Sequence, residues 1–342
     1  MLASLDPVAV AADLAQRMAL EVAEGISAQV MVLPAADGAR SLRVEVEGSH
    51  NRLATVDARY ALPAIANAYS PASHDGFTVH ASRSAGRGVT LLDVQGQAHI
   101  IERPAGYRGD ALLLASHQEG NGAYTYNLLF AYNHAARGLL LEAVVVNLNL
   151  SRCERAFASS YRLDGLLAQG SPLADFDGAQ ALRTLDAAYA QLQGSGKRHK
   201  LMPLELEQAV ARALAAYKRA DRPALEQHIA GLGIDDEGCS TASDVTEMLF
   251  FPGRLGWSND VGLLLEQTGR YAQAVALLSA VVQADPDRVV ARLNLADSYW
   301  GKGDPVQAAR QYASYQALMA RKGWSARAPA RVAERLALGA VQ

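Results

Sequence analysis

The side chains best suited to chemistry are scattered along this chain and do not gather into a recognised motif. Residues 194–197, Gly-Ser-Gly-Lys, have the Gly and Lys of a phosphate-binding loop. However, Gln191 occupies the place of the leading Gly, and the segment follows a predicted helix where the motif follows a strand. His117 and Glu119 stand at a predicted strand end and could line a pocket, although we favour an ordinary loop. We therefore expect no nucleotide binding and keep an enzyme with an N-terminal pocket as one alternative.

The sequence gives no stronger indication of a metal site or of catalytic carboxylates. The histidines form no pair at metal-ligand spacing, and no Ser/His/Asp set is recognised. The paired carboxylates Asp175 and Asp177, and those at 235–237, fall in predicted loops and helix starts, where free amides favour acids. Cys153 and Cys239 stand far apart and either form one disulfide or remain separate thiols. We predict no catalytic residues, no metal and no cofactor.

Length and composition narrow the classes of function. The chain has 342 residues, half of them hydrophobic, and a formal net charge of −3. This size predicts two or three structural units, and the near-neutral charge gives no reason to expect nucleic acid as a partner. The apolar stretch at 139–146 is much shorter than the roughly 18–20 residues that span a membrane. Because residues 1–22 lack a basic segment before an apolar run, we expect a cytoplasmic protein, or a periplasmic one if a leader has been removed.

The N-terminal part of the chain is predicted to combine helices with a sheet. Apolar residues at helical spacing over 6–24 and an alanine-rich segment over 58–69 predict two helices packed on that sheet. Between them, residues 28–33 and 42–46 are predicted strands, the second because apolar and charged residues alternate.

Residues 78–150 are predicted to form a meander of antiparallel hairpins. Successive side chains of a strand point to opposite faces, so the segment 124–132 gathers large apolar side chains on one face. These side chains are Tyr124, Tyr126, Leu128, Phe130 and Tyr132. That face needs a cover from another layer. The apolar run at 139–146 predicts a strand that is buried on both faces and central in the sheet.

The remainder of the chain has a helical pattern. Asp177 is a suitable N-cap for a helix that continues to residue 193, and residues 197–200 are predicted as a loop. Two further helices, over 204–217 and 223–229, form a hairpin with the outline of an imperfect repeat.

The last third of the chain contains an internal repeat. Residues 255–288 align with residues 289–322 at a period of 34, and each copy reads as two helices joined by a turn. Gly262 allows the two helices of the first copy to approach closely, while Gly269 and Gly303 permit the backbone angles of the turns. The other small residues at predicted crossings are Ala274, Ala296 and Ala308. This pattern resembles the tetratricopeptide repeat.

The resemblance implies a function in binding. In this family the first helix of each repeat lines a concave groove that receives an extended peptide or a partner's helix. Carried over by position, the groove residues are Asn259, Leu263 and Glu266 in the first copy and Leu293, Asp297 and Trp300 in the second. Trp300 is the expected anchor, because buried aromatic side chains dominate binding energy at interfaces. The alternative is that Trp300 packs on the flanking helix or on the N-terminal domain.

A narrower resemblance concerns the biological role. Residues 259–319, with DPDRVVARLNLADSYWGKGD at their centre, resemble the C-terminal repeats of bacterial proteins found beside secreted-toxin genes. That resemblance implies an immunity protein that occludes the active site of a toxin or effector. Two alternatives stay open, namely an assembly scaffold that forms homo-oligomers and the enzyme with an N-terminal pocket.

These patterns together predict the α+β class, with an N-terminal, mostly antiparallel β-sheet domain with flanking helices followed by all-α helical repeats. The predicted parts are an α+β domain over 1–170, a degenerate hairpin and linker over 171–254, the repeats over 255–322 and a capping helix over 323–342. Because two repeats cannot cover both of their outer faces, we expect the hairpin and the capping helix to pack at the two ends. The predicted function is non-catalytic binding of another protein, without nucleic acid or membrane insertion.

Overall fold

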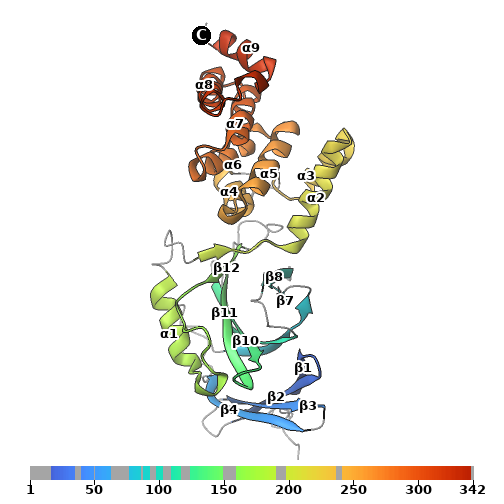
Figure 1. The fold of residues 1–342 in the computed structure, drawn as a ribbon, viewed down its shortest axis with the longest axis vertical. Coiled ribbons are helices and arrows are strands. Elements are labelled where there is room, and N and C mark those ends of the chain that lie inside the picture. The colour runs from blue at the N-terminus through green and yellow to red at the C-terminus, as the bar shows by residue number, and fades with distance from the viewer. Residues whose placement is uncertain are drawn as a thin grey trace, which may run out of the picture. The chain divides into compact units, whose positions relative to one another are not determined.

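The computed structural model describes residues 17–34, 40–49, 51–62, 77–85, 88–92, 98–102, 109–116, 124–148, 159–189, 198–235 and 241–339 (Figure 1). The chain divides into two compact units. The first comprises residues 1–149 and 160–201, and the second comprises residues 150–159 and 202–342. The first unit is built mostly from antiparallel strands and the second from helices, as the predicted α+β class requires.

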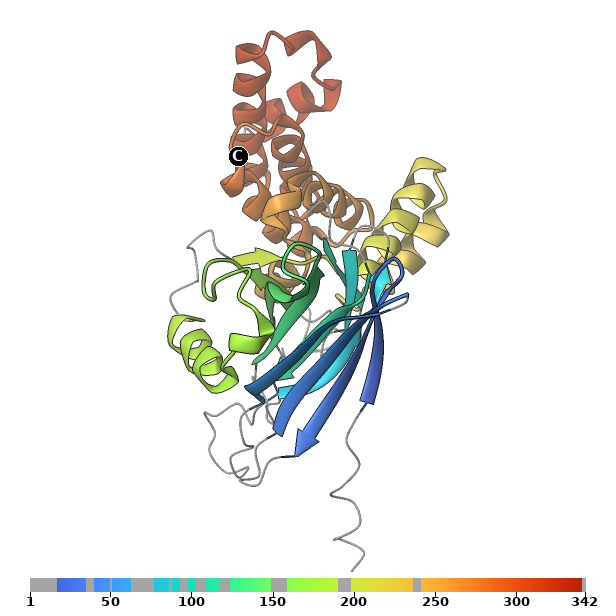
Figure 2. The same ribbon diagram turned by 60° about the horizontal axis from the view of Figure 1, so that its bottom comes forward.

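The first sheet contains the strands β1 (Arg17–Ala23), β2 (Ile26–Pro34), β3 (Arg40–Gly48) and β4 (Arg52–Leu62), side by side in that order (Figure 2). Along β3, the buried Leu42, Val44 and Val46 alternate with more exposed side chains. On the opposite face, Arg43 pairs with Asp57 at 2.7 Å. The sheet therefore has one apolar face for the core and one solvated face, as is common for antiparallel sheets.

The two helices predicted near the N-terminus are wrong where the structure describes these segments. Residues 17–23 are strand β1, and residues 58–62 are the end of strand β4. Met18 and Val22 are spaced as on a helix, but a separation of four residues also keeps them on one face of a strand. Pairing of β1 with β2 satisfies the backbone polar groups and decides between these patterns. Residues 6–16 and 63–69 of these predicted helices lie outside the described residues.

The second sheet has the order β13-β12-β11-β10-β9-β5. Its strands are β5 (Phe77–Ser82), β9 (Ala111–Ser116), β10 (Tyr124–Asn133), β11 (Gly138–Leu148), β12 (Ser159–Leu163) and β13 (Arg198–Lys200). Strand β11 is central and buried on both faces, which confirms its prediction: Val144 and Val146 join one core cluster, and Ala143 and Val145 join the other. The loop predicted at 197–200 is wrong for residues 198–200, because they pair with β12.

The aromatic face predicted on β10 is also confirmed for its described side chains. Tyr126, Leu128, Phe130 and Tyr132 share one core cluster with the apolar face of the first sheet. The side chain of Tyr124 lies outside the described residues. Two sheets thus pack face to face over a continuous core.

A third sheet covers the opposite face of the second. It contains β6 (Ser84–Ala85), β7 (Gly88–Leu92) and β8 (Ala98–Glu102), and its Val89, Leu91 and Ile101 pack with Leu129 and Val145. The predicted meander is therefore wrong in this region. Strand β5 pairs directly with β9, while the segment between them leaves to form the third sheet.

A short helical segment completes the first unit. It consists of η1 (Leu173–Asp175) and α1 (Gly178–Tyr189), both of which contact β4. The side chain of Asp177 accepts a hydrogen bond from the backbone N–H of Gln180 at 2.9 Å, which confirms the predicted N-cap. Between the two helices, the ring of Phe176 meets that of Phe130 edge-on at 5.1 Å.

Asp110 ties the first strand to the rest of this unit. Its backbone N–H donates to the carbonyl of Glu21 at 2.7 Å. Its carboxylate accepts hydrogen bonds from the backbone N–H groups of Ser84 (3.0 Å) and Glu21 (3.2 Å) and from Arg83 Nη1 (2.5 Å). Burial works to raise the pKa of Asp110, but these hydrogen bonds outweigh it, so the pKa is lowered overall.

We expect the first unit to lose stability in acid through this carboxylate. The folded-state pKa of Asp110 lies below the value of about 3.9 for an unfolded Asp. The ionised carboxylate therefore favours folding above about pH 4, and that contribution disappears as the pH falls through the lowered folded-state pKa. The Tm of Asp110→Asn should be lower than that of the wild type at neutral pH, with a gap that closes in acid. A Tm difference that does not change with pH would contradict this role.

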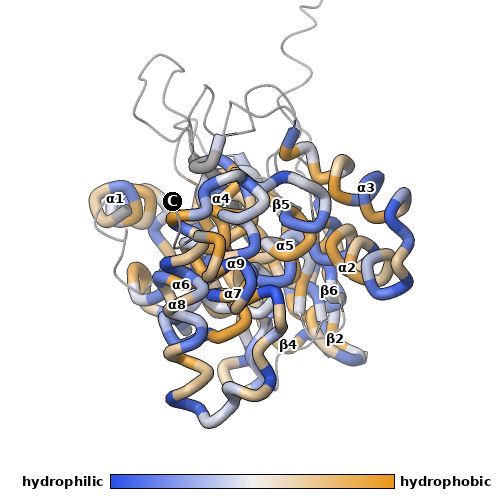
Figure 3. The backbone as a smooth tube through the Cα atoms, turned by 90° about the horizontal axis from the view of Figure 1, so that it is seen from above, coloured by the Kyte–Doolittle hydropathy of each residue, from blue (hydrophilic) through white to orange (hydrophobic). Residues whose placement is uncertain are grey.

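The second unit consists of packed helices. They are α2 (Leu204–Lys218), α3 (Arg222–Ala230), α4 (Ala242–Leu249), η3 (Pro252–Arg254), α5 (Leu255–Gln267), α6 (Tyr271–Ala284), α7 (Val289–Gly301), α8 (Pro305–Arg321), η4 (Ser325–Arg327) and α9 (Ala330–Gly339). Each of the helices α5 to α9 packs on the next along the chain, and α5 also packs on α7. Helices α2 and α3 contact α5, and α4 packs on α6. Hydrophilic and hydrophobic residues alternate along α2 and α3, as they must on helices with one buried face (Figure 3).

The same turn closes several of these helices. After α5, Gly269 has φ of 78° and the N–H of Arg270 donates to the carbonyl of Leu265 at 2.8 Å. The equivalent hydrogen bonds after α2, α7 and α8 join Asp221 to Ala216, Asp304 to Tyr299 and Trp324 to Met319. In this type of helix C-cap, a residue with positive φ allows the following N–H to bond one of the last carbonyls of the helix. The α2–α3 hairpin therefore closes in the same way as the two repeat copies.

Candidate protein-binding surface

The helix pairs of the two repeat copies cross at small residues, as predicted. A Cβ atom on Gly262 of α5 would lie 2.5 Å from Cγ of Leu278 on α6, so a larger residue would push the helices apart. Ala274, Ala296 and Ala308 are fully buried. Gly262 thus lets α5 pack closely on α6, and α5 also packs on α7.

The predicted binding residues lie on α5 and α7 at helical spacing. They are Asn259, Leu263 and Glu266 on α5, and Leu293, Asp297 and Trp300 on α7. The amide of Asn294 donates to Oδ1 of Asn259 at 3.2 Å, which joins the two helices through buried or half-buried groups. Leu263 and Glu266 are half-buried and keep access to solvent. We call the face of α5 that carries these two residues, together with the adjoining face of α7, the α5/α7 surface.

Asp297 is the centre of a network that sequence reasoning missed. Its carboxylate accepts hydrogen bonds from Arg331 Nη2 (2.8 Å), Arg335 Nη1 (2.6 Å) and the Tyr312 hydroxyl (2.6 Å). Burial and the hydrogen bond to Asp297 raise the pKa of Tyr312, which keeps its hydroxyl protonated as the donor. Both arginines belong to α9, so the network fixes α9 to α7. The 34-residue period could have suggested the pairing of Asp297 with Arg331, because Arg331 follows Asp297 by one repeat length.

Trp300 packs against its own chain. The guanidinium of Arg335 lies over the indole, with Cζ 5.2 Å from the ring centroid. Trp300 and Leu293 also pack against a buried cluster that includes Tyr312 and Val332. This is the alternative in which Trp300 packs on the flanking helix. Leu293 and Trp300 are half-buried, as are Leu263 and Glu266 of the first copy.

Glu266 carries a carboxylate that no cation neutralises directly in the described structure. Its Oε2 accepts a hydrogen bond from the amide of Gln267 at 2.6 Å, and no ion pair joins it. Burial raises the pKa of Glu266 and the charge of Asp297 raises it further, against smaller opposing effects of the hydrogen bond from Gln267 and of the charges of Arg335 and Arg331. An ionised group in this state is stabilised by any cation that approaches it.

Helices α5 to α8 include a segment that is similar to a known repeat family. A model of the tetratricopeptide repeat matches residues 265–322, from the end of α5 to the end of α8. The chain contains tetratricopeptide repeats. Repeats of this kind generally mediate protein–protein interactions, which agrees with a partly open face on α5 and α7. No curated protein matches this chain.

One Ser–His contact in the first unit also escaped sequence reasoning. Ser160 Oγ lies 3.3 Å from His99 Nε2, although the residues are 61 positions apart. Both residues have no exposed surface, so a substrate cannot reach the hydroxyl in the described structure. We interpret the contact as a hydrogen bond of the core. Its distance along the chain explains why no local motif revealed it.

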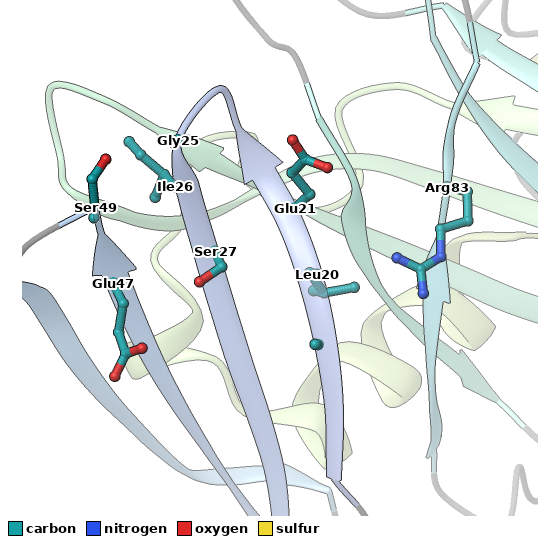
Figure 4. A pocket seen from close by; sticks show the side chains of 10 residues that line it. Leu20, Glu21, Gly25, Ile26, Ser27, Glu47, Ser49 and Arg83 are labelled. Carbon is teal, nitrogen blue, oxygen red and sulfur yellow. The ribbon is translucent and has the colours of Figure 1, made fainter.

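A pocket of about 620 Å³ lies beside the β1–β2 hairpin of the first unit (Figure 4). Figure 4 shows Glu47 and Ser49 on one side of it and Arg83 on the other. Neither His nor Cys lines this pocket. The pocket residues predicted from the sequence, His117 and Glu119, lie outside the described residues, as do both cysteines and residues 191–197.

Asp177 and Asp235, two of the paired carboxylates noted in the sequence, make structural hydrogen bonds. Asp177 caps α1, and Asp235 accepts a hydrogen bond from Arg270 Nη2 at 2.6 Å. Within the described ranges, no group of three or more His, Cys, Asp or Glu residues could hold a metal ion. Among the helices in that part of the chain, none has both the length and the apolarity needed to cross a bilayer.

Proposed function

We propose that this protein is a non-catalytic binding protein that holds another protein at the α5/α7 surface. The observation that carries the proposal is the half-buried carboxylate of Glu266, which has no ion-pair partner among the described residues and lies near Leu263 on helix α5. A partner that places Lys or Arg against Glu266 would supply the missing cation, and a charge-assisted hydrogen bond in a partly dry site is stronger than one in water. An apolar side chain of the partner, next to that Lys or Arg, would cover Leu263.

Charge reversal at Glu266 should therefore weaken binding without unfolding the protein. We expect Glu266→Lys to weaken capture of the partner by at least about tenfold, or about 1.4 kcal/mol. Glu266→Gln should also weaken binding, yet it should raise the free energy of unfolding by about 0.5–1 kcal/mol, because it removes a desolvated charge. Affinity capture with the tagged full chain from native host cells measures the first effect, and denaturant titration measures the second.

A matched control is Glu102→Lys, which makes the same charge change at an exposed residue of β8. It should leave capture unchanged. Equal capture by the wild type and a folded Glu266→Lys protein would refute the proposed surface. If the captured species is a second copy of the chain, sedimentation at several concentrations will reveal it, and the scaffold alternative then applies.

The more specific proposal is that the partner is a secreted toxin or effector, which this protein neutralises as an immunity protein. It is supported by the resemblance of residues 259–319 to repeats found beside toxin genes. Blocking an active site requires tight stoichiometric binding and no catalysis. Each neighbouring gene of the source genome should be expressed with and without this chain. We expect one product to arrest growth alone and to be tolerated together with this protein, and failure of rescue would refute the toxin proposal.

A further inference from the structure

A second exposed cluster lies in the turn between α8 and α9. Trp324 is 41% exposed. Nζ of Lys322 lies 5.5 Å from the centroid of its ring, and Cζ of Arg327 lies 5.9 Å from it. Both cations are themselves exposed. Trp and Arg contribute much of the binding energy at interfaces, so an exposed indole flanked by two exposed cations is a candidate docking site.

The backbone of this turn is held in place. Gly323 has φ of 69°, and the N–H of Trp324 donates to the carbonyl of Met319 at 2.8 Å. The N–H of Arg327 then donates to the carbonyl of Trp324 at 2.8 Å. The backbone that carries the indole and the two cations is therefore preorganised, which lowers the entropy lost on binding.

The charge of this cluster is unbalanced. The neighbouring Arg321 is paired with Asp287 at 2.5 Å. Among the described residues, no carboxylate lies within ion-pair distance of Lys322 or Arg327. The cluster thus offers an apolar surface between two unpaired positive charges, and the complementary ligand is anionic with an apolar group.

We propose that Trp324, Lys322 and Arg327 form a second docking site, for an acidic segment of a protein partner. An apolar side chain of that segment packs on the indole, and flanking Asp or Glu carboxylates bind the two cations. An acidic peptide supplies both features within a few residues. The site has different residues and the opposite charge from the α5/α7 surface, so it goes beyond the proposed function and is tested separately.

A library of random peptides displayed on phage, selected on the immobilised full chain, tests the proposal. We expect the enriched peptides to combine Asp or Glu with an aromatic or aliphatic residue. Recovery of these peptides should fall at least about tenfold on Trp324→Ala, which corresponds to about 1.4 kcal/mol. Trp324→Phe should retain most of the recovery. The double variant Lys322→Glu, Arg327→Glu should instead favour basic peptides.

Tyr217→Ala is the matched control, because Tyr217 is an aromatic residue at the end of α2 that is 36% exposed. It should not change recovery. Absence of enrichment, enrichment without acidic residues, or equal recovery by Trp324→Ala would each overturn the proposal. A labelled single-stranded DNA oligonucleotide that binds more tightly than the selected peptides and requires Trp324 would overturn it in favour of nucleic acid. Loss of binding at Glu266 with retention at Trp324 would affect only the proposed function.

Discussion

Asp297→Ala is expected to lower the free energy of unfolding of the helical unit by about 2–4 kcal/mol. The substitution removes the common acceptor of Arg331, Arg335 and the Tyr312 hydroxyl. It leaves these donors partly buried without a partner. We place the loss below that of a fully buried pair because the side chains of Arg331 and Arg335 are 43% and 26% exposed, so water screens them. Denaturant titration measures the loss, and faster amide exchange in α9 should accompany it.

Asp287→Ala provides the control for this network. Asp287 also pairs with an arginine 34 residues later, Arg321, but both side chains are more than half exposed, at 66% and 61%. An exposed pair of this kind contributes little, so we expect a change of at most about 0.5 kcal/mol. Similar losses for the two variants would show that the Asp297 network does not hold α9 to the repeats.

Gly109→Ala should destabilise the first unit by about 2–5 kcal/mol. Gly109 has φ of 94°, and a Cβ atom there would lie 2.3 Å from the carbonyl carbon of Val22 and 2.4 Å from its oxygen. These are backbone atoms of β1, so they cannot move aside as a flexible side chain can. The substitution would also displace the adjacent Asp110 from its hydrogen bonds to Glu21. Thermal unfolding of the purified chain measures the loss.

Gly170→Ala separates the two contributions to this loss. Gly170 also has a positive φ, of 84°, but a Cβ atom there would meet nothing within 4 Å. The control should therefore cost only the left-handed backbone strain, about 1–2 kcal/mol. A loss as large as that for Gly109→Ala would mean that close contact with β1 is not the constraint.

Local rules predicted much of the architecture. Gly262, Gly269 and Gly303 identified the repeat because helix crossings and turns restrict residue type at the position itself. The alternation along 124–132 identified a face that needs cover, and the structure places it against the first sheet. The N-cap at Asp177 was predictable for the same reason, since a cap requires a short side-chain acceptor beside the helix.

Long-range pairing decided what local patterns could not. Residues 17–23 have a spacing that fits either a helix or a strand, and only the neighbouring β2 selects the strand. Asp297 was assigned to an open groove from its position, but α9 supplies two arginines that occupy its carboxylate. Trp300 and Trp324 could not be ranked for exposure, because each depends on which distant side chains pack against it. Periodicity reports which face of an element is apolar, whereas the choice of partner for that face depends on contacts that only the folded chain brings together.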